Sequence, residues 1–373
     1  MILFLSSGVS LESKLPSVHE VRTELIKGAE DPRLLKLFEL LVELDTDYLK
    51  NSAPFKVSST GQTGYTGQIF RAETTYEDLF YLIDQIVING EGRKADLTVG
   101  SFVDFLCRKA KPFLKGSTEI ERAVDLHYLA IDARRFIEHK VSSLLRASEV
   151  KGLDLVIKLA ISPSVYKLNI ITLNHDTLIE QLLTEHNIVY TDGFGKPDGD
   201  VRWFKDEFSD NIKVRIIKLH GSISWWNQAG SNVVQPVNIT DQDSDKWRNK
   251  KGENIKDIGR VPSFLTGVSK VYSYNRGIFA DQNYRFLQLL HGENRMIMSG
   301  YGWGDLPINF QLQNWLARDD ENILILLHRD PIFLYENSPE LRQVYVKYTK
   351  SKKIVPIEKW LSETSLAKIE QYL

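Results

Sequence analysis

The chain has 373 residues, of which 42% are hydrophobic and 26% charged, so it can bury a sizeable core as ordinary globular proteins do. Its 47 basic and 49 acidic residues give a formal net charge of -2, which provides no global attraction to nucleic acid or to a membrane surface. No stretch reaches the length of a membrane span, and the apolar start Met1–Leu5 is too short for a signal peptide. We therefore expect a cytoplasmic protein with no membrane partner and no direct nucleic-acid binding.

The chain has a single cysteine, Cys107. One thiol can form neither an intrachain disulfide nor a four-cysteine zinc module, and it fits a reducing compartment. Its apolar, helical context favours a core residue over a nucleophile. Because histidines are not clustered either, we expect no metal site.

Short apolar runs predict the buried strands of a parallel sheet that is covered by helices on both faces. These runs are Ile2–Leu5, Leu168–Leu173, Val214–Leu219, Met296–Ser299 and Ile323–Leu327. All except the last end in a polar or glycine-containing loop. Open parallel sheets bind ligands beyond the carboxyl ends of their strands, so these loops are the candidate site.

Residues from about 28 to 160 contain no convincing parallel strand and are predicted to form a helical insertion or subdomain. Helical spacing of apolar residues is seen in Val18–Lys27, Arg33–Leu49, Tyr76–Ile88, Phe102–Leu114 and Glu119–Leu145. Asn51–Gln68 is predicted to be a loop, and so is the polar, lysine-rich region of about 228–270. We interpret residues 1–373 as one α/β domain with these additions. Glu119–Leu145 either packs only on its own domain or meets another subunit.

Two of the candidate loops contain small and amide side chains. Ser6–Ser10 follows the first strand, and a turn of small residues there lets backbone N–H groups approach a pyrophosphate. Asn174 and Asp176 follow the second strand, where they can hydrogen-bond a ribose or a carboxamide. Asp176 equally suits the N-terminal cap of the helix that follows, and its sequence leaves both roles open.

The other two candidate loops contain a histidine and a run of glycines. His220 ends a strand beside Gly221, a position that suits general-base chemistry near neutral pH. By residue type alone it does not differ from His175 or His291. The last loop, Ser299–Asp305, has three glycines before a predicted helix, and Asp305 can cap that helix or contact a ribose.

The order of these four motifs resembles that of sirtuin-like domains, over roughly residues 1–27 and 165–330. The resemblance is strongest to the bacterial sirtuin-like proteins of antiphage defence, which hydrolyse NAD and carry long helical insertions. It implies a Rossmann-like parallel sheet with no zinc module, and NAD as substrate without a metal. The residues that it assigns to catalysis are Asn174, His220 and Asp176. Those that it assigns to NAD binding are Gly8, Ser10, Thr172, Gly221, Gly300, Tyr301 and Asp305.

The resemblance also implies individual roles. Gly8 and Ser10 hold the phosphates, Asn174 orders the nicotinamide ribose and the attacking water, and Asp176 contacts the carboxamide. His220 acts as a base or stabilises the reacting ribose. The adenosine side of the pocket is lined by Gly300, Tyr301 and Asp305. The sequence departs from the usual pattern in having Ser6 and Ser7 in place of Gly-Ala, and Gly302 in place of Ser.

The activity implied is an NAD glycohydrolase. The alternatives are an NAD-dependent protein deacylase or ADP-ribosyltransferase, and a non-catalytic module that senses NAD or ADP-ribose. The absence of a four-cysteine module weakens the deacylase reading. The short region after Asp305, ending in a predicted amphipathic helix at Trp360–Leu373, holds no evident sensor domain. We therefore expect a homo-oligomer restrained or activated by another chain, for which the resemblance indicates a HerA-like ATPase.

Overall fold

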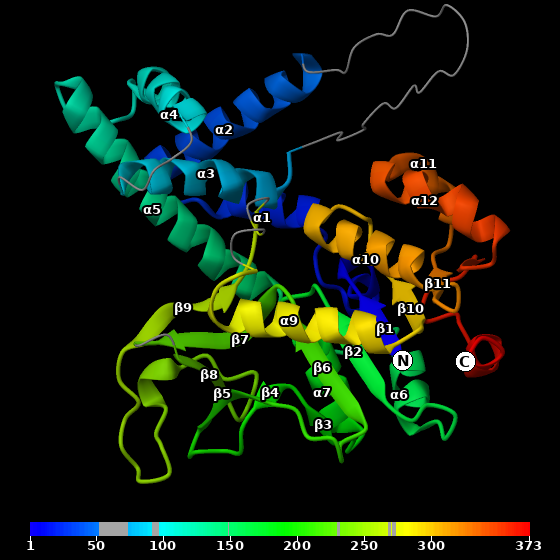
Figure 1. Ribbon diagram of the computed structural model, residues 1–373. Coiled ribbons are helices and arrows are strands. Elements are labelled where there is room, and N and C mark those ends of the chain that lie inside the picture. Colours follow the sequence, from blue (N-terminus) through cyan, green and yellow to red (C-terminus); the bar gives the residue numbers. More distant parts are fainter. Residues whose placement is uncertain (52–73, 92–96, 148, 230–231, 268–269, 271–273) are drawn as a thin grey trace, which may run out of the picture. The chain divides into compact units, whose positions relative to one another are not determined.

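A computed structural model of the chain (Figure 1) describes residues 1–51, 74–91, 97–147, 149–229, 232–267, 270 and 274–373. Side chains of residues 47–51 and 97–98 are outside this description, as is nearly all of the predicted loop Asn51–Gln68. The chain divides into two units. One comprises Met1–Leu15, Leu145–Leu265 and Lys270–Leu373, and the other Pro16–Leu144 and Thr266–Ser269. The prediction of one domain with a helical insertion over about 28–160 stays a prediction.

The first unit is built on a seven-stranded sheet in which every pair of neighbouring strands is parallel. Its strands are β1 (Ile2–Leu5), β2 (Leu168–Thr172), β3 (Tyr190–Thr191), β6 (Val214–Lys218), β10 (Arg295–Ser299), β11 (Ile323–Leu327) and β12 (Ile354–Ile357). The five apolar runs seen in the sequence are all strands of this sheet. The sequence missed β12 because Pro356 interrupts it, and an edge strand is where a sheet tolerates proline.

Alternate side chains of each strand enter two separate cores, because successive residues of a strand point to opposite faces. In β1, Ile2 and Phe4 join one core, and Leu3 and Leu5 the other. The first core is covered by α9 (Gly277–Gly292), α10 (Leu306–Arg318), α11 (Pro331–Asn337) and α12 (Pro339–Lys350). The second is covered by α6 (Asp154–Ile161), α7 (Leu178–Glu185) and α13 (Leu366–Glu370). The predicted α/β class with a parallel, helix-covered sheet is therefore confirmed.

The order of the strands reverses once. Along the sheet it is β12-β11-β10-β1-β2-β6-β3, so the chain moves from β1 through β2 to β6 and then returns to the other side of β1 for β10. Leaving aside the two-residue β3, this is the six-stranded order of a Rossmann fold. In such sheets the ligand crevice opens where the order reverses, here between the carboxyl ends of β1 and β10.

An antiparallel sheet follows directly on the parallel one in the same unit. Its strands, in sheet order, are β4 (Gly193–Phe194), β5 (Val201–Glu207), β8 (Asn232–Pro236), β7 (Gly221–Gln228) and β9 (Ile258–Phe264). Trp225 and Trp226 of β7 enter different clusters, and Trp226 meets Trp247 edge to face. Strands β8 and β9 lie within the region of 228–270 that we expected to be a loop. Their short apolar segments become strands through pairing with β7, which local composition does not reveal.

The second unit is helical. Its helices are α1 (Val18–Gly28), α2 (Pro32–Asn51), α3 (Tyr76–Gly90), α4 (Leu97–Ala110) and α5 (Glu119–Leu144), close to the predicted segments. Ion pairs join α2 to α5 through Arg33 and Asp125 at 2.5 Å, and α3 to α5 through Asp84 and Arg134 at 3.2 Å. Cys107 on α4 is half-buried rather than a core residue, and burial raises the pKa of its thiol. The raised pKa argues against a nucleophilic role.

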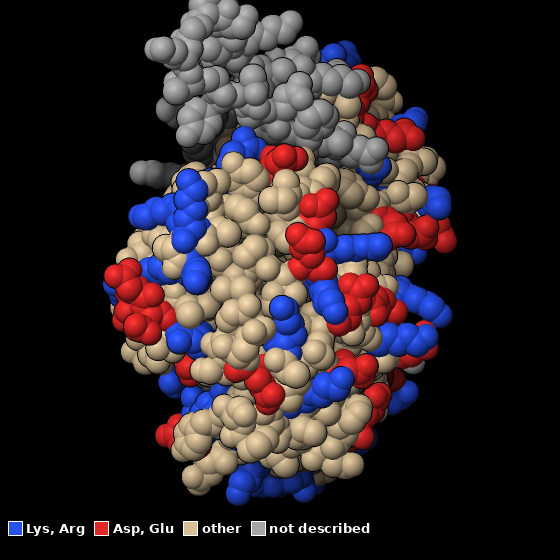
Figure 2. Space-filling view, turned by 90° about the vertical axis from the view of Figure 1, so that its right-hand side faces the viewer, with Lys and Arg blue, Asp and Glu red and all other residues tan. Residues whose placement is uncertain are grey.

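The end of the chain differs from its prediction. Trp360–Leu373 was expected to be one amphipathic helix, but only Leu366–Glu370 is helical and a turn occupies Leu361–Glu363. Among the described residues, no helix combines the length and the apolar character needed to cross a membrane. Figure 2 shows basic and acidic side chains interspersed over one face of the molecule.

Candidate active site

Asn174 and His220 come to the same edge of the sheet through the register of β2 and β6. Thr172 is the partner of Lys218 in this parallel pair, and each candidate lies two residues beyond its strand's last pair. The N–H of Asn174 donates to Thr172 Oγ1 at 3.0 Å, and the N–H of Leu219 donates to the Thr172 carbonyl at 3.0 Å. Thr172 is thus buried and holds the start of the Asn174 loop in place.

Ser10, from the turn after β1, joins Asn174 to Asp176. Its hydroxyl accepts from Asn174 Nδ2 at 2.9 Å and donates to Asp176 Oδ2 at 2.8 Å. The other oxygen, Asp176 Oδ1, accepts at 3.1 Å the N–H of Leu178, the first residue of α7, although the N-cap position itself belongs to Thr177. Asp176 thus supports the start of the helix from one residue before the cap, and its Oδ2 faces the polar cluster of Ser10, Asn174 and Asp176.

A buried ion pair lies beneath this cluster. Lys218 Nζ is 2.9 Å from Glu180 Oε1 and also donates to the carbonyl of Asp176, and both side chains are almost fully buried. Burial raises the pKa of Glu180, and the charge of Lys218 opposes that rise. Lys218 thus connects β6 to the backbone of the Asp176 loop. Sequence reasoning missed this pair, because nothing local marks a lysine that ends a strand as buried.

A second polar cluster surrounds His220, which links β6 to β7. Its Nε2 lies 2.6 Å from Tyr274 Oη and 3.0 Å from Asp305 Oδ2. Tyr274 Oη also donates to Asp305 Oδ2 at 3.2 Å. Asp305 caps α10 through Oδ1, which accepts the N–H of Ile308 at 3.2 Å. Nothing in the sequence indicated Tyr274, and Asp305 was predicted only as a cap or a ribose contact.

Burial would raise the pKa of Asp305, but the hydrogen bond and charge of His220, with the charge of Lys270 and the N–H of Ile308, hold it at about 2. Asp305 is therefore a carboxylate at neutral pH.

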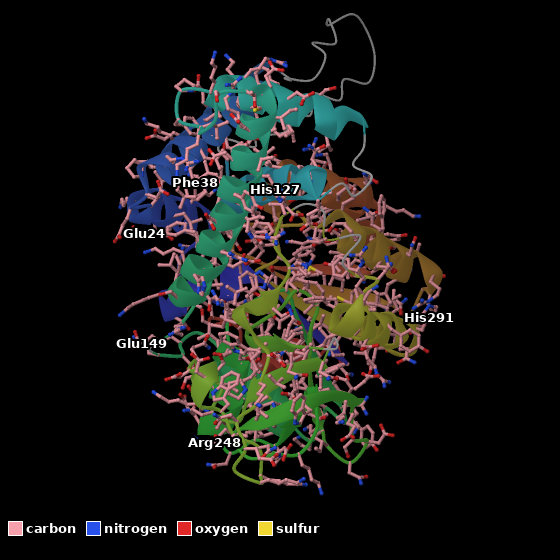
Figure 3. All side chains as sticks on the ribbon, turned by 90° about the vertical axis from the view of Figure 1, so that its left-hand side faces the viewer. Glu24, Phe38, His127, Glu149, Arg248 and His291 are labelled. Atoms are coloured by element: carbon pink, nitrogen blue, oxygen red, sulfur yellow. The ribbon has the colours of Figure 1, made fainter. Side chains whose placement is uncertain are left out.

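The other two histidines considered above differ from His220. His175 is buried, with its ring centroid 6.1 Å from that of His220, and burial holds its pKa well below the usual range. Its Nδ1 has no hydrogen-bond partner within the described part of the protein. His291 lies at the outer end of α9 (Figure 3), exposed and 3.1 Å from Arg318. Of these three histidines, His220 is the one that combines a strand end with a carboxylate partner.

Two of the predicted glycines meet each other. The N–H of Gly8 donates to the carbonyl of Gly300 at 3.1 Å, and the N–H of Ser6 donates to that of Ser299 at 3.1 Å. These bonds join the loops after β1 and β10, where the strand order reverses. In this structure the Gly8 N–H therefore serves a contact between loops rather than standing open to a phosphate.

Gly221 and Tyr301 support the loops through backbone conformation and buried packing, respectively. Gly221 has a φ of +79°, and a β-carbon there would lie 2.5 Å from the carbonyl oxygen of Ser263, so the turn from β6 into β7 requires glycine. Tyr301 is buried against Phe4, with ring centroids 5.3 Å apart, and its hydroxyl donates to Asn309 Oδ1 at 2.6 Å. Burial raises its pKa well above the usual range.

The predicted site residues thus form two polar clusters and their supports. Ser10, Asn174 and Asp176 make the first cluster, and His220 and Asp305 belong to the second, with Tyr274 added. The supporting positions are Gly8, Thr172, Gly221, Gly300 and Tyr301. No group of His, Cys, Asp or Glu side chains in the described ranges is arranged to hold a metal ion.

The chain is similar to known proteins described as SIR2-like or Sir2. Residues 168–357 match the model of the family described as SIR2-like domain. A Sir2 homolog solved in complex with NAD is 11% identical, with a TM-score of 0.36 over 100% of this chain and 86% of that one. A structure of a Sir2 enzyme is 10% identical, with a TM-score of 0.35 over 100% and 90% of the two chains. No curated protein matches the sequence.

A Rossmann-type parallel sheet with polar clusters at its switch point defines the general class of the molecule. The family match takes in half of the chain and contains β2, β6 and β10 with the loops that follow them. The chain belongs to the SIR2-like domain family.

Proposed function

We propose that the chain is an NAD glycohydrolase, which converts NAD and water to nicotinamide and ADP-ribose. The observation that carries the proposal is the pairing of Thr172 with Lys218, which puts Asn174 and His220 at one sheet edge in a SIR2-like domain. Both lie beside the reversal of strand order, where open α/β sheets bind nucleotides. Neither a metal nor a redox cofactor takes part in the proposed reaction.

The reaction breaks the bond between the ribose C1 and the nicotinamide nitrogen. The electron pair of that bond goes to the positively charged nicotinamide ring, which leaves as a neutral molecule, and a water oxygen forms the new bond to C1. The proton of that water is released, and His220 is the residue assigned to take it up. The protein's main task is to position the water and stabilise an oxocarbenium-like ribose.

The polar clusters suit these tasks. The Asn174 amide carries donor and acceptor groups for a ribose hydroxyl or a water, and Ser10 fixes its orientation. Asp176 Oδ2 faces the same cluster and can accept from a carboxamide. In the proposed binding mode Ser10 and Asp305 contact the nucleotide, while the loops around it are shaped by Gly8, Thr172, Gly221, Gly300 and Tyr301. The buried, unpartnered His175 Nδ1 and Trp303 Nε1 add unmet hydrogen-bonding capacity near these loops in the described structure.

The test is a turnover assay. Purified protein incubated with NAD should release nicotinamide and ADP-ribose in equal amounts, and an acetylated peptide should not increase the rate. Asn174→Ala and His220→Ala should each abolish release, whereas the surface variant His291→Ala should match the wild type. Peptide-dependent release would favour a deacylase, and tight binding without release a sensor. Wild-type turnover by both active-site variants would refute the assignment.

We also propose that this activity serves antiphage defence in the cytoplasm by depleting NAD. An unregulated NAD hydrolase would drain the cell's own pool, so its activity needs control by another component. The resemblance indicates a HerA-like ATPase as that partner. NAD turnover should therefore change when the chain is co-expressed with such an ATPase. Full activity of the isolated chain, unaltered by the partner, would contradict this regulation.

The exposed face of α5 supports the proposed homo-oligomer. Ile120, Val124 and Tyr128 are spaced four residues apart, so they share one side of the helix, and they are 79%, 50% and 61% exposed. A second copy of the chain could bury this stripe. Sedimentation should show an oligomer that Val124→Glu dissociates, while Val346→Glu, at an exposed valine of α12, leaves it intact. A strict monomer at micromolar concentration would exclude the oligomer.

A further inference from the structure

Three buried polar groups form a closed triangle around one nitrogen of His220. Tyr274 is 4% exposed, and the side chains of His220 and Asp305 are 5% and 8% exposed. His220 Nε2 lies 2.6 Å from Tyr274 Oη and 3.0 Å from Asp305 Oδ2, and these two oxygens lie 3.2 Å apart. Because the three groups are shielded from water, each of their hydrogens needs an acceptor within the protein. A buried donor without a hydrogen bond costs free energy.

The chemistry of the three groups decides where the hydrogens are. Asp305 is ionised at neutral pH, so it only accepts. Tyr274 has one hydrogen, which can point to Asp305 Oδ2 or to His220 Nε2 but in neither case lies between those two atoms. A bare Nε2 lone pair would then face the carboxylate at 3.0 Å with no hydrogen between them. The geometry therefore requires a proton on Nε2 and leaves Nδ1 as the atom that can accept another.

We propose that Asp305 is a positioning residue for His220, and that Tyr274 is the bridge between them. The pair fixes the neutral ring as its Nε2–H tautomer and stabilises the positive ring that forms when Nδ1 takes up a proton. The inference deepens the proposed function, in which His220 is the base, and it moves Asp305 from nucleotide contact to the support of that base. The two oxygens of Asp305 have different partners, since Oδ1 caps α10 and Oδ2 lies within hydrogen-bond distance of His220 Nε2.

The surroundings of His220 agree with this role. Asp305 and Tyr274 face it from the start of α10 and the segment before α9. His175 faces it from the loop after β2 and is held neutral by burial, while Lys270 adds a positive charge nearby that opposes protonation. Asp305 thus places a negative charge against the ring, and its loss should lower the pKa of His220.

The chain offers a matched control in Asp330. It caps α11 as Asp305 caps α10, with its carboxylate accepting the N–H of Phe333 at 2.8 Å and a proline in the first turn. Its neighbouring ring is His328 and not His220. Asp330→Asn therefore removes a capping carboxylate without touching the triangle.

The experiment is an NMR titration of the full chain labelled with ¹⁵N-histidine, in which the His220 signals are those lost in His220→Gln. In the wild type the neutral His220 ring should carry its proton on Nε2. In Asp305→Asn the pKa of His220 should fall by about 1 unit or more, and in Asp330→Asn it should not move. A wild-type ring protonated on Nδ1 would overturn the proposal without any variant, and so would an unchanged pKa in a folded Asp305→Asn protein.

Turnover adds a second readout. The acid limb of kcat/KM against pH should move to lower pH in Asp305→Asn by the same amount as the NMR pKa, and Tyr274→Phe should keep the tautomer. If His220→Ala cleaved NAD normally while the NMR shift held, the proposed function would fail and the pairing would stand. If turnover required His220 but Asp305→Asn moved neither readout, the pairing would fail alone.

Discussion

A β-carbon built on Gly8 would lie 2.7 Å from the Cα of Gly300. The reverse contact is equally tight, since a β-carbon on Gly300 would lie 2.6 Å from the carbonyl oxygen of Ser6. The loops after β1 and β10 thus touch through backbone at the switch point of the sheet. Their glycines are required for that contact, whatever their part in binding a nucleotide.

Alanine at either glycine should therefore lower the free energy of unfolding. Gly300→Ala adds the strain of a φ of +73° to the clash, and a loss of about 1–3 kcal/mol or more is expected at each position. Gly302→Ala is the control, because no atom lies within 4 Å of its built β-carbon, and it should stay within about 0.5 kcal/mol of the wild type. Urea denaturation measures all three. Equal stability of Gly8→Ala and Gly302→Ala would contradict the close contact.

The helical unit should lose stability as the pH rises from about 4.5 to about 7. Burial raises the pKa of Glu138 on α5 from 4.5 to about 7, with Asp84 adding to the rise and Arg134 opposing it. Folding therefore takes up a proton between these pH values. The stability contributed by protonated Glu138 is complete below pH 4.5 and is lost as the pH passes 7. Glu138→Gln, which stays neutral, should be more stable than the wild type at pH 8.

The size of this effect is bounded. A shift from 4.5 to about 7 corresponds to at most roughly 3 kcal/mol, and the side chain retains enough solvent contact to reduce it. Thermal unfolding at pH 5 and pH 8 gives the comparison, with the exposed Glu39→Gln of α2 as control. If both glutamine variants kept the wild-type pH dependence, Glu138 would not be its source.

Breaking the buried pair of Lys218 and Glu180 should be severe. Lys218→Met leaves the Glu180 carboxylate buried without its cation, which costs about 3–5 kcal/mol in comparable pairs. Adding Glu180→Leu should recover part of that loss, because both charges are then gone. Lys246→Met, which breaks the exposed pair with Asp243, should change stability little. A double variant less stable than Lys218→Met would show that the unpaired charge of Glu180 does not cause the loss of stability in Lys218→Met.

The strands that carry the site could be predicted because burial on both faces leaves a local signature. Leu168–Thr172 and Ile323–Leu327 are apolar runs that only a covered parallel sheet explains, and the loops after such strands mark the ligand edge. Asn174 and His220 were singled out as candidates for this reason. The helices were equally visible, because the spacing of their apolar residues is a local property.

What could not be predicted depends on contacts between distant segments. No neighbour of Tyr274 in the sequence indicates that its hydroxyl reaches His220. Likewise, no neighbour of Lys218 indicates that it pairs with the buried Glu180 of α7. Strands β8 and β9 exist through pairing with β7 rather than through strong patterns of their own. Gly8 was noticed for a possible ligand, whereas its closest neighbour is Gly300.

Ser10 should affect turnover through Asn174. In Ser10→Ala the Asn174 amide loses the hydroxyl that accepts its Nδ2 proton, and Asp176 loses a donor. Asn174 is then free to rotate, and kcat/KM for NAD should fall roughly tenfold or more, as for a lost hydrogen bond of about 1–3 kcal/mol. Ser13→Ala is the matched control, since Ser13 is a buried serine of the same segment whose hydroxyl bonds the backbone of Lys151.

The variants should separate stability from activity. Ser13→Ala should lower stability about as much as Ser10→Ala but leave kcat/KM near the wild-type value. In an Asn174→Ala background, which should have no turnover, NAD affinity is the readout, and Ser10→Ala should weaken it no further, because the residue it orients is already absent. A full, additive loss of affinity in the double variant would mean that Ser10 acts on NAD directly, as the sequence first indicated, and not through Asn174.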